Sequence, residues 1–539
     1  MAGSSEAFEG GNKTPAVNSN AKSAEEGLKR ADGITGLYEG NVFETSPENR
    51  REIGVFSAAL LIFNRVIGTG IFATPSTILQ LSGSVGLALF MWVIGTLIAL
   101  AGTAVYLEWG TAIPRNGGEK NYLEYVYQKP KFFATAMFAS YAFFLGWAAS
   151  NSVVFGQYIL NAADVEVDRW NQRGIGLACL TVAFLVHAVA LKWGLRLVNF
   201  LGIVKLIVIV FITVTGWVAL AGHTRVPTHN FHNAFEGTQG SGYSIVMALY
   251  NVIWSFIGYS NANYALSETK NPARTLKIAA PTAIISVGIL YMFVNIAYFA
   301  AVPKEQMLKS GSVVAATFFG NMFGARAEKA MSVLVALSAF GNVLSVIFSQ
   351  DEVFVQELGR EGVLPFSKFF ASNWPFHSPA AGLFEHYIVS AIILLAPPPG
   401  DAYNFLLNLI SYPLSIVNSF VAAGLIYIYL NREKKFPTWS PPIRATLPVT
   451  VFFFLSNVYL VIAPYIPPDA GQNVYEQLPY YLHCVVALGV FAFGALYYLG
   501  WAVLLPKLGK YVLVKETVVD ADGWSRSVYT KLPQTAAPS

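Results

Sequence analysis

The amino-acid sequence predicts an all-α polytopic membrane protein with about twelve transmembrane helices. Of its 539 residues, 54% are hydrophobic and 12% are charged, and the mean hydropathy of +0.49 is far from that of a soluble globular protein. Long apolar runs recur from residue 53 to residue 505. Glycine-rich segments interrupt the first and sixth of these runs, at residues 67–72 and 256–261.

Each apolar run of about 20 residues is long enough to cross a bilayer as a helix. The expected spans are, in order, residues 53–80, 85–109, 132–160, 175–191, 196–221, 243–267, 277–301, 328–356, 380–396, 402–430, 446–464 and 478–505. The first, sixth, eighth and tenth spans are longer than one straight crossing requires, which a tilt or a central break would explain.

The two tails are polar. Residues 1–52 predict a disordered tail with no cleaved signal segment, because no apolar core precedes residue 53, and residues 506–539 form the second tail. Of the 35 Lys and Arg residues, 26 fall on the side of the tails, 7 on the other side and 2 within spans. This bias predicts that both termini are cytosolic. It also accounts for the net charge of +4 without a nucleic-acid partner.

The first ten spans predict an internal repeat. Residues 53–221 and 243–430 can be aligned, five spans on five, with the two interruptions in register. Because five is odd, the second repeat must run through the membrane in the opposite sense, and inverted repeats place a substrate at their interface near the midplane. The alternative is that both glycine segments are helix-packing surfaces, where small residues are common. The extra helices at residues 446–505 are expected to pack laterally or to form a dimer contact.

The first interruption predicts an anion site. A helix that resumes after Gly70 exposes backbone N–H groups at its positive end, and glycine lets a carboxylate approach the backbone. We therefore expect Gly68, Thr69 and Gly70 to bind a carboxylate. At the second break, near Ile257 and Gly258, freed carbonyl oxygens favour a cation such as an ammonium group. Together the two breaks predict a receptor for a zwitterion.

Three segments resemble signatures of the amino acid-polyamine-organocation superfamily. They are residues 65–72, 114–119 and 267–274, which read RVIGTGIF, PRNGGE and SETKNPAR. Within the superfamily, residues 53–505 resemble the L-type amino acid transporters and most closely the fungal high-affinity methionine permeases. The resemblance implies inverted five-helix repeats with helices 1 and 6 broken, plus two extra helices. It also implies import of a neutral amino acid, methionine being the first candidate, across the plasma membrane by alternating access. We expect this import to be a proton symport.

By position, the resemblance places the family's amino-group contacts on the carbonyls of Val66, Trp254 and Ile257. It also places the family's aromatic gate on Trp254, although an aromatic residue in an apolar helix is otherwise a packing residue. Ile67 and Ser260, one in each break, complete the expected substrate-binding set.

Lys205 is an amine well inside the fifth span, where a charge is expensive and is by default functional or paired. In sodium-independent members of the superfamily, a lysine at this place resembles a built-in substitute for a sodium ion, its amine reaching the break in the first span. Two roles stay open: Lys205 binds and releases the coupled proton, or it is a permanently charged strut that braces the break. Both disfavour sodium.

Arg65 lies roughly 18 Å along the first helix, too deep for easy contact with the cytosol. Arg65 must contact backbone carbonyls or an acid. Its role is then either to form a structural salt bridge or to bind the substrate directly. The candidate acids are Glu108, Glu268, Asp351 and Glu352. Other polar residues within spans either line a cavity or form interhelical hydrogen bonds. They are Asn151, Ser152, Ser260, Asn261, Asn263, Asn342, Ser345, Asn404 and Asn408.

Nothing in the sequence predicts an enzyme, a metal site or a cofactor. The seven histidines form no HExxH pattern, and Cys179 and Cys484 lie within spans, which argues against a disulfide-linked heavy chain. The alternative functions are a broad L-type amino acid exchanger, a polyamine or choline permease, and a nutrient sensor that binds without transporting. The amino-terminal lysines suit ubiquitin-ligase adaptors, as the resemblance to nutrient permeases implies, or simply belong to a solvated tail.

Overall fold

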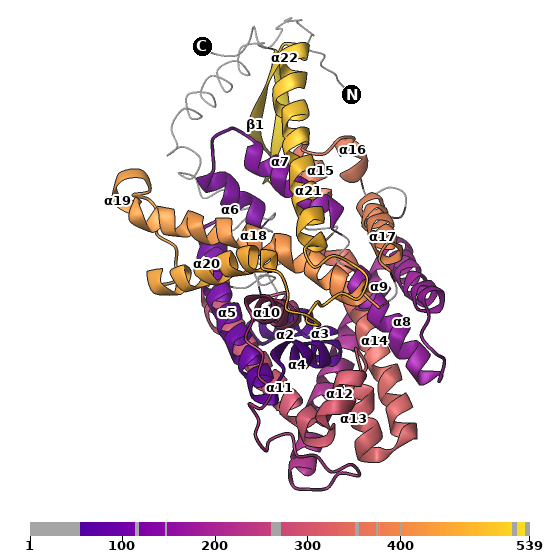
Figure 1. The fold of residues 1–539 in the computed structure, drawn as a ribbon. Helices are drawn as coiled ribbons and strands as arrows, with labels where there is room; N and C mark the ends of the chain where they lie inside the picture. The colour runs from indigo at the N-terminus through magenta and orange to yellow at the C-terminus, as the bar shows by residue number, and fades with distance from the viewer. Residues whose placement is uncertain are drawn as a thin grey trace, which may run out of the picture.

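The computed structural model is an elongated helical bundle (Figure 1). It describes residues 54–113, 118–145, 148–259, 271–350, 355–372, 376, 378–398, 400–519 and 525–533. Within these ranges, nine helical segments are long and apolar enough to cross a membrane, and three shorter apolar helices accompany them. The prediction of an all-α polytopic membrane protein is confirmed.

The first five predicted spans correspond to helices α2 to α9. Their bounds are α2 Val55–Val66, α3 Gly70–Ala73, α4 Pro75–Ser82, α5 Val85–Ala112, α6 Glu119–Val126, α7 Phe133–Phe144, α8 Ala149–Ala162 and α9 Arg169–Leu220. The first span is broken between α2 and α3, as predicted. Pro75 starts α4, where its missing N–H costs no hydrogen bond.

Helix α9 is one continuous element of 52 residues, which would measure about 78 Å if it were straight. That length is more than twice the hydrocarbon thickness of a bilayer. The backbone at Ala190 is non-helical (φ −133°, ψ 49°), so a kink divides α9 into the fourth and fifth spans. The hydroxyl of Ser378 donates to the carbonyl of Ala188 (2.6 Å) beside this kink and satisfies a backbone group that would otherwise be buried.

The next five spans correspond to helices α10 to α18. Their bounds are α10 Gly242–Phe256, α11 Pro272–Ala301, α12 Lys304–Lys309, α13 Val314–Phe323, α14 Ala325–Gln350, α15 Gln356–Glu361, α16 Ser367–Phe370, α17 Ala380–Leu395 and α18 Ala402–Leu430. Among the described residues, the nine long segments, with α9 counted as two crossings and with α10 and α17 added, give the twelve expected spans. Helices α12 and α13, at the lower end of the bundle in Figure 1, were not predicted.

The carboxyl-terminal part adds two transmembrane helices and a β-hairpin. Its bounds are α19 Arg432–Lys435, α20 Leu447–Ile462, a 3₁₀ turn η5 Ala463–Tyr465, α21 Leu482–Tyr498, a π-helical turn η6 Leu499–Leu504, α22 Leu505–Gly509, β1 Tyr511–Val519 and β2 Ser525–Pro533. The strands pair antiparallel, from Tyr511 opposite Pro533 to Val519 opposite Ser525. The predicted tail therefore contains an ordered hairpin, at the upper end of the bundle in Figure 1.

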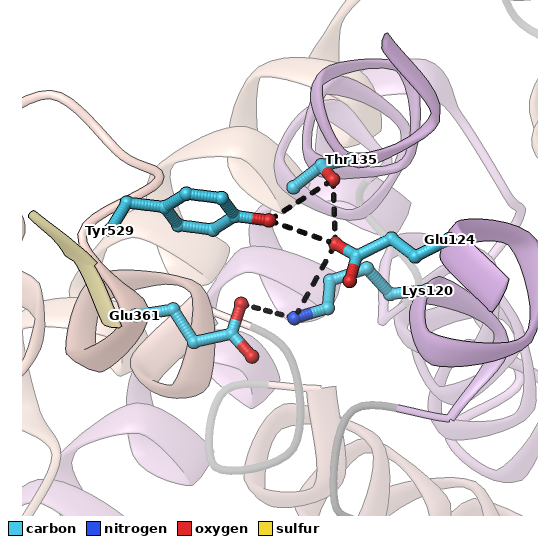
Figure 2. A network of polar contacts seen from close by, with 5 residues as sticks. All are labelled: Lys120, Glu124, Thr135, Glu361 and Tyr529. Carbon is cyan, nitrogen blue, oxygen red and sulfur yellow. Dashed lines mark hydrogen bonds and ion pairs between the residues drawn. The ribbon is translucent and has the colours of Figure 1, made fainter. Parts of the chain in front are cut away.

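Tyr529 on β2 docks the hairpin onto the bundle (Figure 2). Its side chain is only 8% exposed and packs edge-on against Phe132 (5.1 Å between ring centroids) and Trp501 (5.3 Å). Its hydroxyl lies 3.2 Å from the Glu124 carboxylate and 3.4 Å from the Thr135 hydroxyl. The hairpin is thus joined to α6, to α7 and to the π-helical turn η6 that follows α21.

The polar network around Tyr529 also ties α6 to α15. Lys120 on α6 forms an ion pair with Glu361 on α15 and approaches the Glu124 carboxylate at 3.9 Å (Figure 2). Burial by itself would lower the pKa of Lys120, but the negative charges of Glu361 and Glu124 outweigh it and raise that pKa. The amine therefore stays charged, and the loop after the second span is held against the loop after the eighth.

We predict that Tyr529→Ala releases the hairpin from the bundle. Removing a buried aromatic side chain typically costs about 3–5 kcal/mol of stability. Because about 1.4 kcal/mol corresponds to a tenfold change in an equilibrium, the released form of the hairpin should become more than ten times more populated. Tryptic cleavage within residues 510–531 of the purified protein should accelerate at least tenfold. The matched control is Glu516→Ala, because Glu516 lies on the same hairpin and is exposed. Equal cleavage rates in the two variants would show that Tyr529 does not dock the hairpin.

Candidate functional site

The first span is interrupted for three residues. Helix α2 ends at Val66, Ile67 has extended backbone (φ −74°, ψ 96°), and α3 begins at Gly70. Within the described residues, no backbone carbonyl accepts a hydrogen bond from the amides of Gly68, Thr69 or Gly70. These N–H groups are therefore available at the start of a helical segment, as the sequence predicted.

The sixth span is interrupted one turn beyond Trp254. Helix α10 ends at Phe256, and the amide of Ile257 donates to the carbonyl of Trp254 (3.2 Å). Gly258 follows with φ of +119°, a conformation that other residues rarely adopt. The continuation of this span, including the predicted site residue Ser260, lies outside the described residues.

The two interruptions contact each other. An added Cβ on Gly70 would lie 2.2 Å from the Ser255 hydroxyl oxygen and 2.8 Å from the Ser255 Cα. An added Cβ on Gly258 would lie 2.7 Å from Cγ of Arg65. The two spans approach so closely that neither Gly70 nor Gly258 leaves room for a side chain. The two breaks therefore lie together at one site and not on separate faces of the bundle.

Lys205 on α9 reaches the first interruption. Its amine donates to the carbonyls of Asn64 (3.0 Å) and Ile67 (2.9 Å), and its side chain is 2% exposed. The last carbonyls of a helix have no partner within that helix, and a cation suits the negative end of the helix dipole. Lys205 therefore satisfies the carbonyl side of the break, while the amide side remains open.

Two asparagines from different helices meet at Thr69. The Thr69 hydroxyl donates to the Asn151 side-chain oxygen (2.6 Å), and the Asn342 amide nitrogen approaches the same oxygen at 3.3 Å. A Cβ on Gly68 would lie 2.4 Å from that Asn342 nitrogen. The sequence analysis named several polar residues within spans that could line a cavity. Of these, Asn151 and Asn342 lie at the site. Asn404 and Asn408 instead bond to residues 474 and 475.

A small cavity of about 20 Å³ lies between the two interruptions. It is lined by Arg65, Val66, Gly68, Thr69, Gly70, Asn151, Trp254, Ser255, Ile257, Asn342 and Val346. Six of the predicted substrate-binding residues therefore share one cavity. Trp254 is among them and is 9% exposed.

Arg65 lines the same cavity, and Glu108 is not its partner. The Glu108 carboxylate accepts hydrogen bonds from the Ala445 amide (2.6 Å), the Trp439 indole (3.0 Å) and the Tyr429 hydroxyl. The other candidate acids for Arg65, residues 268, 351 and 352, lie outside the described residues.

Two tyrosines at the site were not predicted. The Tyr291 hydroxyl on α11 lies 3.2 Å from the Val66 carbonyl oxygen and 3.0 Å from the Ser255 carbonyl oxygen. The buried Tyr403 on α18 approaches the side chains of Thr69 and Trp254. Neither tyrosine stands near a glycine break in the sequence, and each reads as an ordinary aromatic residue of an apolar helix.

Comparison with known proteins identifies amino acid permeases and transporters as relatives. A family model for amino acid permeases matches residues 53–490. The chain is 55% identical to the high-affinity methionine permease of Saccharomyces cerevisiae, over 93% of this chain and 88% of that protein. It is 32% identical to the low-affinity methionine permease of the same yeast, over 90% and 88%. It is 27% identical to the b(0,+)-type amino acid transporter 1 of Mus musculus, over 84% and 90%.

We predict that Gly70→Ala destabilises the protein. The new methyl group would overlap the Ser255 backbone, which cannot move aside as a flexible side chain can, so we expect a loss of about 1–3 kcal/mol and a lower melting temperature. Gly489→Ala is the matched control, because no atom lies within 4 Å of its added Cβ. The control should be neutral or stabilising, since alanine favours a helix over glycine. Equal melting temperatures for the two variants would refute the close approach at Gly70.

Proposed function

Because the chain belongs to the amino acid permease family, we propose that it imports methionine across the plasma membrane by alternating access. The observation that carries the proposal is the contact between two interrupted spans, which places free amides and helix-end carbonyls around one cavity. The 55% identity to a high-affinity methionine permease supports methionine as the neutral amino acid. Both termini are cytosolic in this proposal, as the distribution of Lys and Arg favours.

In the proposed complex, the substrate carboxylate binds the amides of Gly68, Thr69 and Gly70. A helix start with free N–H groups is a suitable anion site, and the close packing at Gly68 and Gly70 leaves no room for a side chain. Thr69 is held in place by its hydrogen bond to Asn151.

The substrate ammonium binds the carbonyls of Val66, Trp254 and Ile257 beside Gly258. The Val66 and Trp254 carbonyls already accept one hydrogen bond each, from the Tyr291 hydroxyl and the Ile257 amide. A carbonyl oxygen has two lone pairs, so each retains capacity for an ammonium proton. Trp254 closes over the ligand, and Ser260 belongs to this part of the proposed site.

Coupling to protons is the second part of the proposal. Lys205 occupies the carbonyl side of the first break with a proton-bearing amine, so loss of that proton would weaken both bonds to Asn64 and Ile67. Proton binding at Lys205 would thereby be linked to the geometry of the substrate site. Residues 1–52 carry the lysines that we propose for ubiquitin-dependent removal from the membrane.

We predict that a permease-deficient yeast expressing this protein accumulates radiolabelled methionine, faster as the outside pH falls. Unlabelled putrescine should not compete, because a diamine has no carboxylate for the Gly68–Gly70 amides. Uptake that is independent of pH and requires internal amino acid would identify an exchanger. Binding of methionine without uptake would identify a sensor, and uptake of putrescine in place of methionine would identify a polyamine permease.

We predict that Lys205→Ala abolishes methionine uptake at normal surface abundance. The variant leaves the Asn64 and Ile67 carbonyls without their hydrogen-bond donor beside the site. Lys192→Ala is the control, because Lys192 lies on the same helix and is exposed. Surface biotinylation measures abundance, and uptake of radiolabelled methionine measures activity. Normal accumulation by Lys205→Ala would remove Lys205 from the mechanism.

A further inference from the structure

A second cavity lies between α12, α13 and the start of α14, helices at the end of the bundle opposite the carboxyl-terminal hairpin (Figure 1). Its volume of about 340 Å³ falls in the range of about 300–1,000 Å³ that is usual for small-molecule sites. Among the described residues, none lines both this cavity and the one between the interrupted spans. Its lining is polar and includes two side chains of opposite charge, Lys309 and Glu328.

The uncharged side chains of this cavity already bond within the protein. The Asn321 amide donates to the Gln306 side-chain oxygen (2.8 Å) and to a backbone carbonyl (2.8 Å), and the Gln306 amide lies 3.3 Å from the Asn321 oxygen. The hydroxyls of Ser310 and Thr317 each donate to a backbone carbonyl, at 2.6 and 3.3 Å. These four residues therefore form a fixed polar wall, and a ligand is not needed to satisfy their donors.

The two charged side chains are different. In the part of the chain that the structure describes, neither the Lys309 amine nor the Glu328 carboxylate forms a hydrogen bond or an ion pair. Lys329, the neighbour of Glu328 in the chain, pairs with Asp164 instead. A Cβ on Gly320 would lie 2.7 Å from a Glu328 carboxylate oxygen, so this carboxylate rests against α13 where glycine leaves room for it. The cavity thus contains one negative and one positive group that do not neutralise each other.

We propose that this cavity is a second binding site for a free α-amino acid, with the ligand ammonium on Glu328 and the ligand carboxylate on Lys309. Hydrogen bonds between ionised groups are about twice as strong as neutral ones, and a zwitterion makes one with each side chain. A ligand with charge of one sign satisfies only one of them. The inference goes beyond the proposed function, because such a site binds an amino acid whether or not the chain transports it.

The cavity lies close to the first interrupted span. Helix α12 packs against α4, and α13 packs against α3, which begins at Gly70 and so borders the substrate cavity. In the proposed topology the carboxyl-terminal tail is cytosolic, so the opposite end of the bundle faces the outside of the cell. An amino acid in the second cavity is therefore held outside the cell, beside the helices that follow the first break.

The test labels the purified full-length protein with the diazirine analogue of methionine and maps the label by mass spectrometry. Trypsin releases residues 310–326, which include Ser310, Thr317 and Asn321 of the cavity, as one peptide. In the wild-type protein we expect saturable labelling of this peptide, and excess glycine, the smallest α-amino acid, should prevent it. Putrescine and acetate, whose charges are of one sign, should be at least about fivefold less effective than glycine.

Two variants change the charged side chain in different ways. Glu328→Gln removes its charge and should lower the labelling of residues 310–326 about three- to tenfold, less than a fully buried charge-assisted hydrogen bond would give, because Glu328 is only half-buried. Gly320→Ala keeps the charge but places a methyl group where the carboxylate rests, so it should also lower the labelling. The matched control is Glu305→Gln, because Glu305 is exposed on α12 and does not line the cavity.

Three outcomes would overturn the inference. They are no saturable labelling of residues 310–326 in the wild-type protein, equal labelling in Glu328→Gln and Glu305→Gln, and protection by putrescine or acetate that equals protection by glycine. Methionine uptake by the permease-deficient yeast tests the proposed function separately. Absence of that uptake would refute the proposed function and leave this inference in place.

Discussion

The structure depends on how two interrupted membrane helices satisfy their freed backbone groups. No lipid can bond to these groups, so protein or a bound molecule must do so. On the carbonyl side of the first break, Lys205 bonds to Asn64 and Ile67, and Tyr291 bonds to Val66. On the amide side, Gly68, Thr69 and Gly70 have no backbone acceptor within the described residues. The carbonyls of the break thus have hydrogen-bond donors, whereas its amides have no backbone acceptor. In our proposal, the substrate carboxylate supplies that acceptor.

Close packing at glycines joins the two repeats. Gly70 lies against the Ser255 backbone, Gly258 against Arg65, and Gly68 against Asn342. Between helices in a membrane, such contacts replace the hydrophobic driving force that lipid removes. The same contacts hold amides and carbonyls from different spans around one cavity. Glycine at these positions therefore serves the assembly of the repeats.

Much of the fold could be predicted from the sequence because membrane helices are local features. Hydrophobicity and length located all twelve spans, and Gly68 and Gly70 marked the first break. The position of Lys205 deep in an apolar run marked it as an unusual residue. The resemblance implied that its amine reaches the break in the first span, and its hydrogen bond to the Ile67 carbonyl agrees with that. Tyr291 could not be found in this way, since its importance comes from contacts with spans one and six. Helix α12 and the carboxyl-terminal hairpin were missed because their charged residues resemble those of loops. Helix α13 is apolar but was missed because its ten residues are too few to cross a bilayer.

The proposed receptor also determines where selectivity must arise. In our proposal, the amides of Gly68–Gly70 bind the carboxylate and the carbonyls of Val66 and Ile257 bind the ammonium, two groups that all α-amino acids share. These main-chain groups cannot distinguish methionine from leucine. Selection must then come from the side chains that line the cavity, among which Trp254 and Ile257 are the largest without a formal charge. Because a methylene in an apolar pocket is worth only about 1–3 kcal/mol, these residues can favour a thioether over a branched chain without excluding it. Substrate preference can therefore differ among relatives that share this backbone receptor.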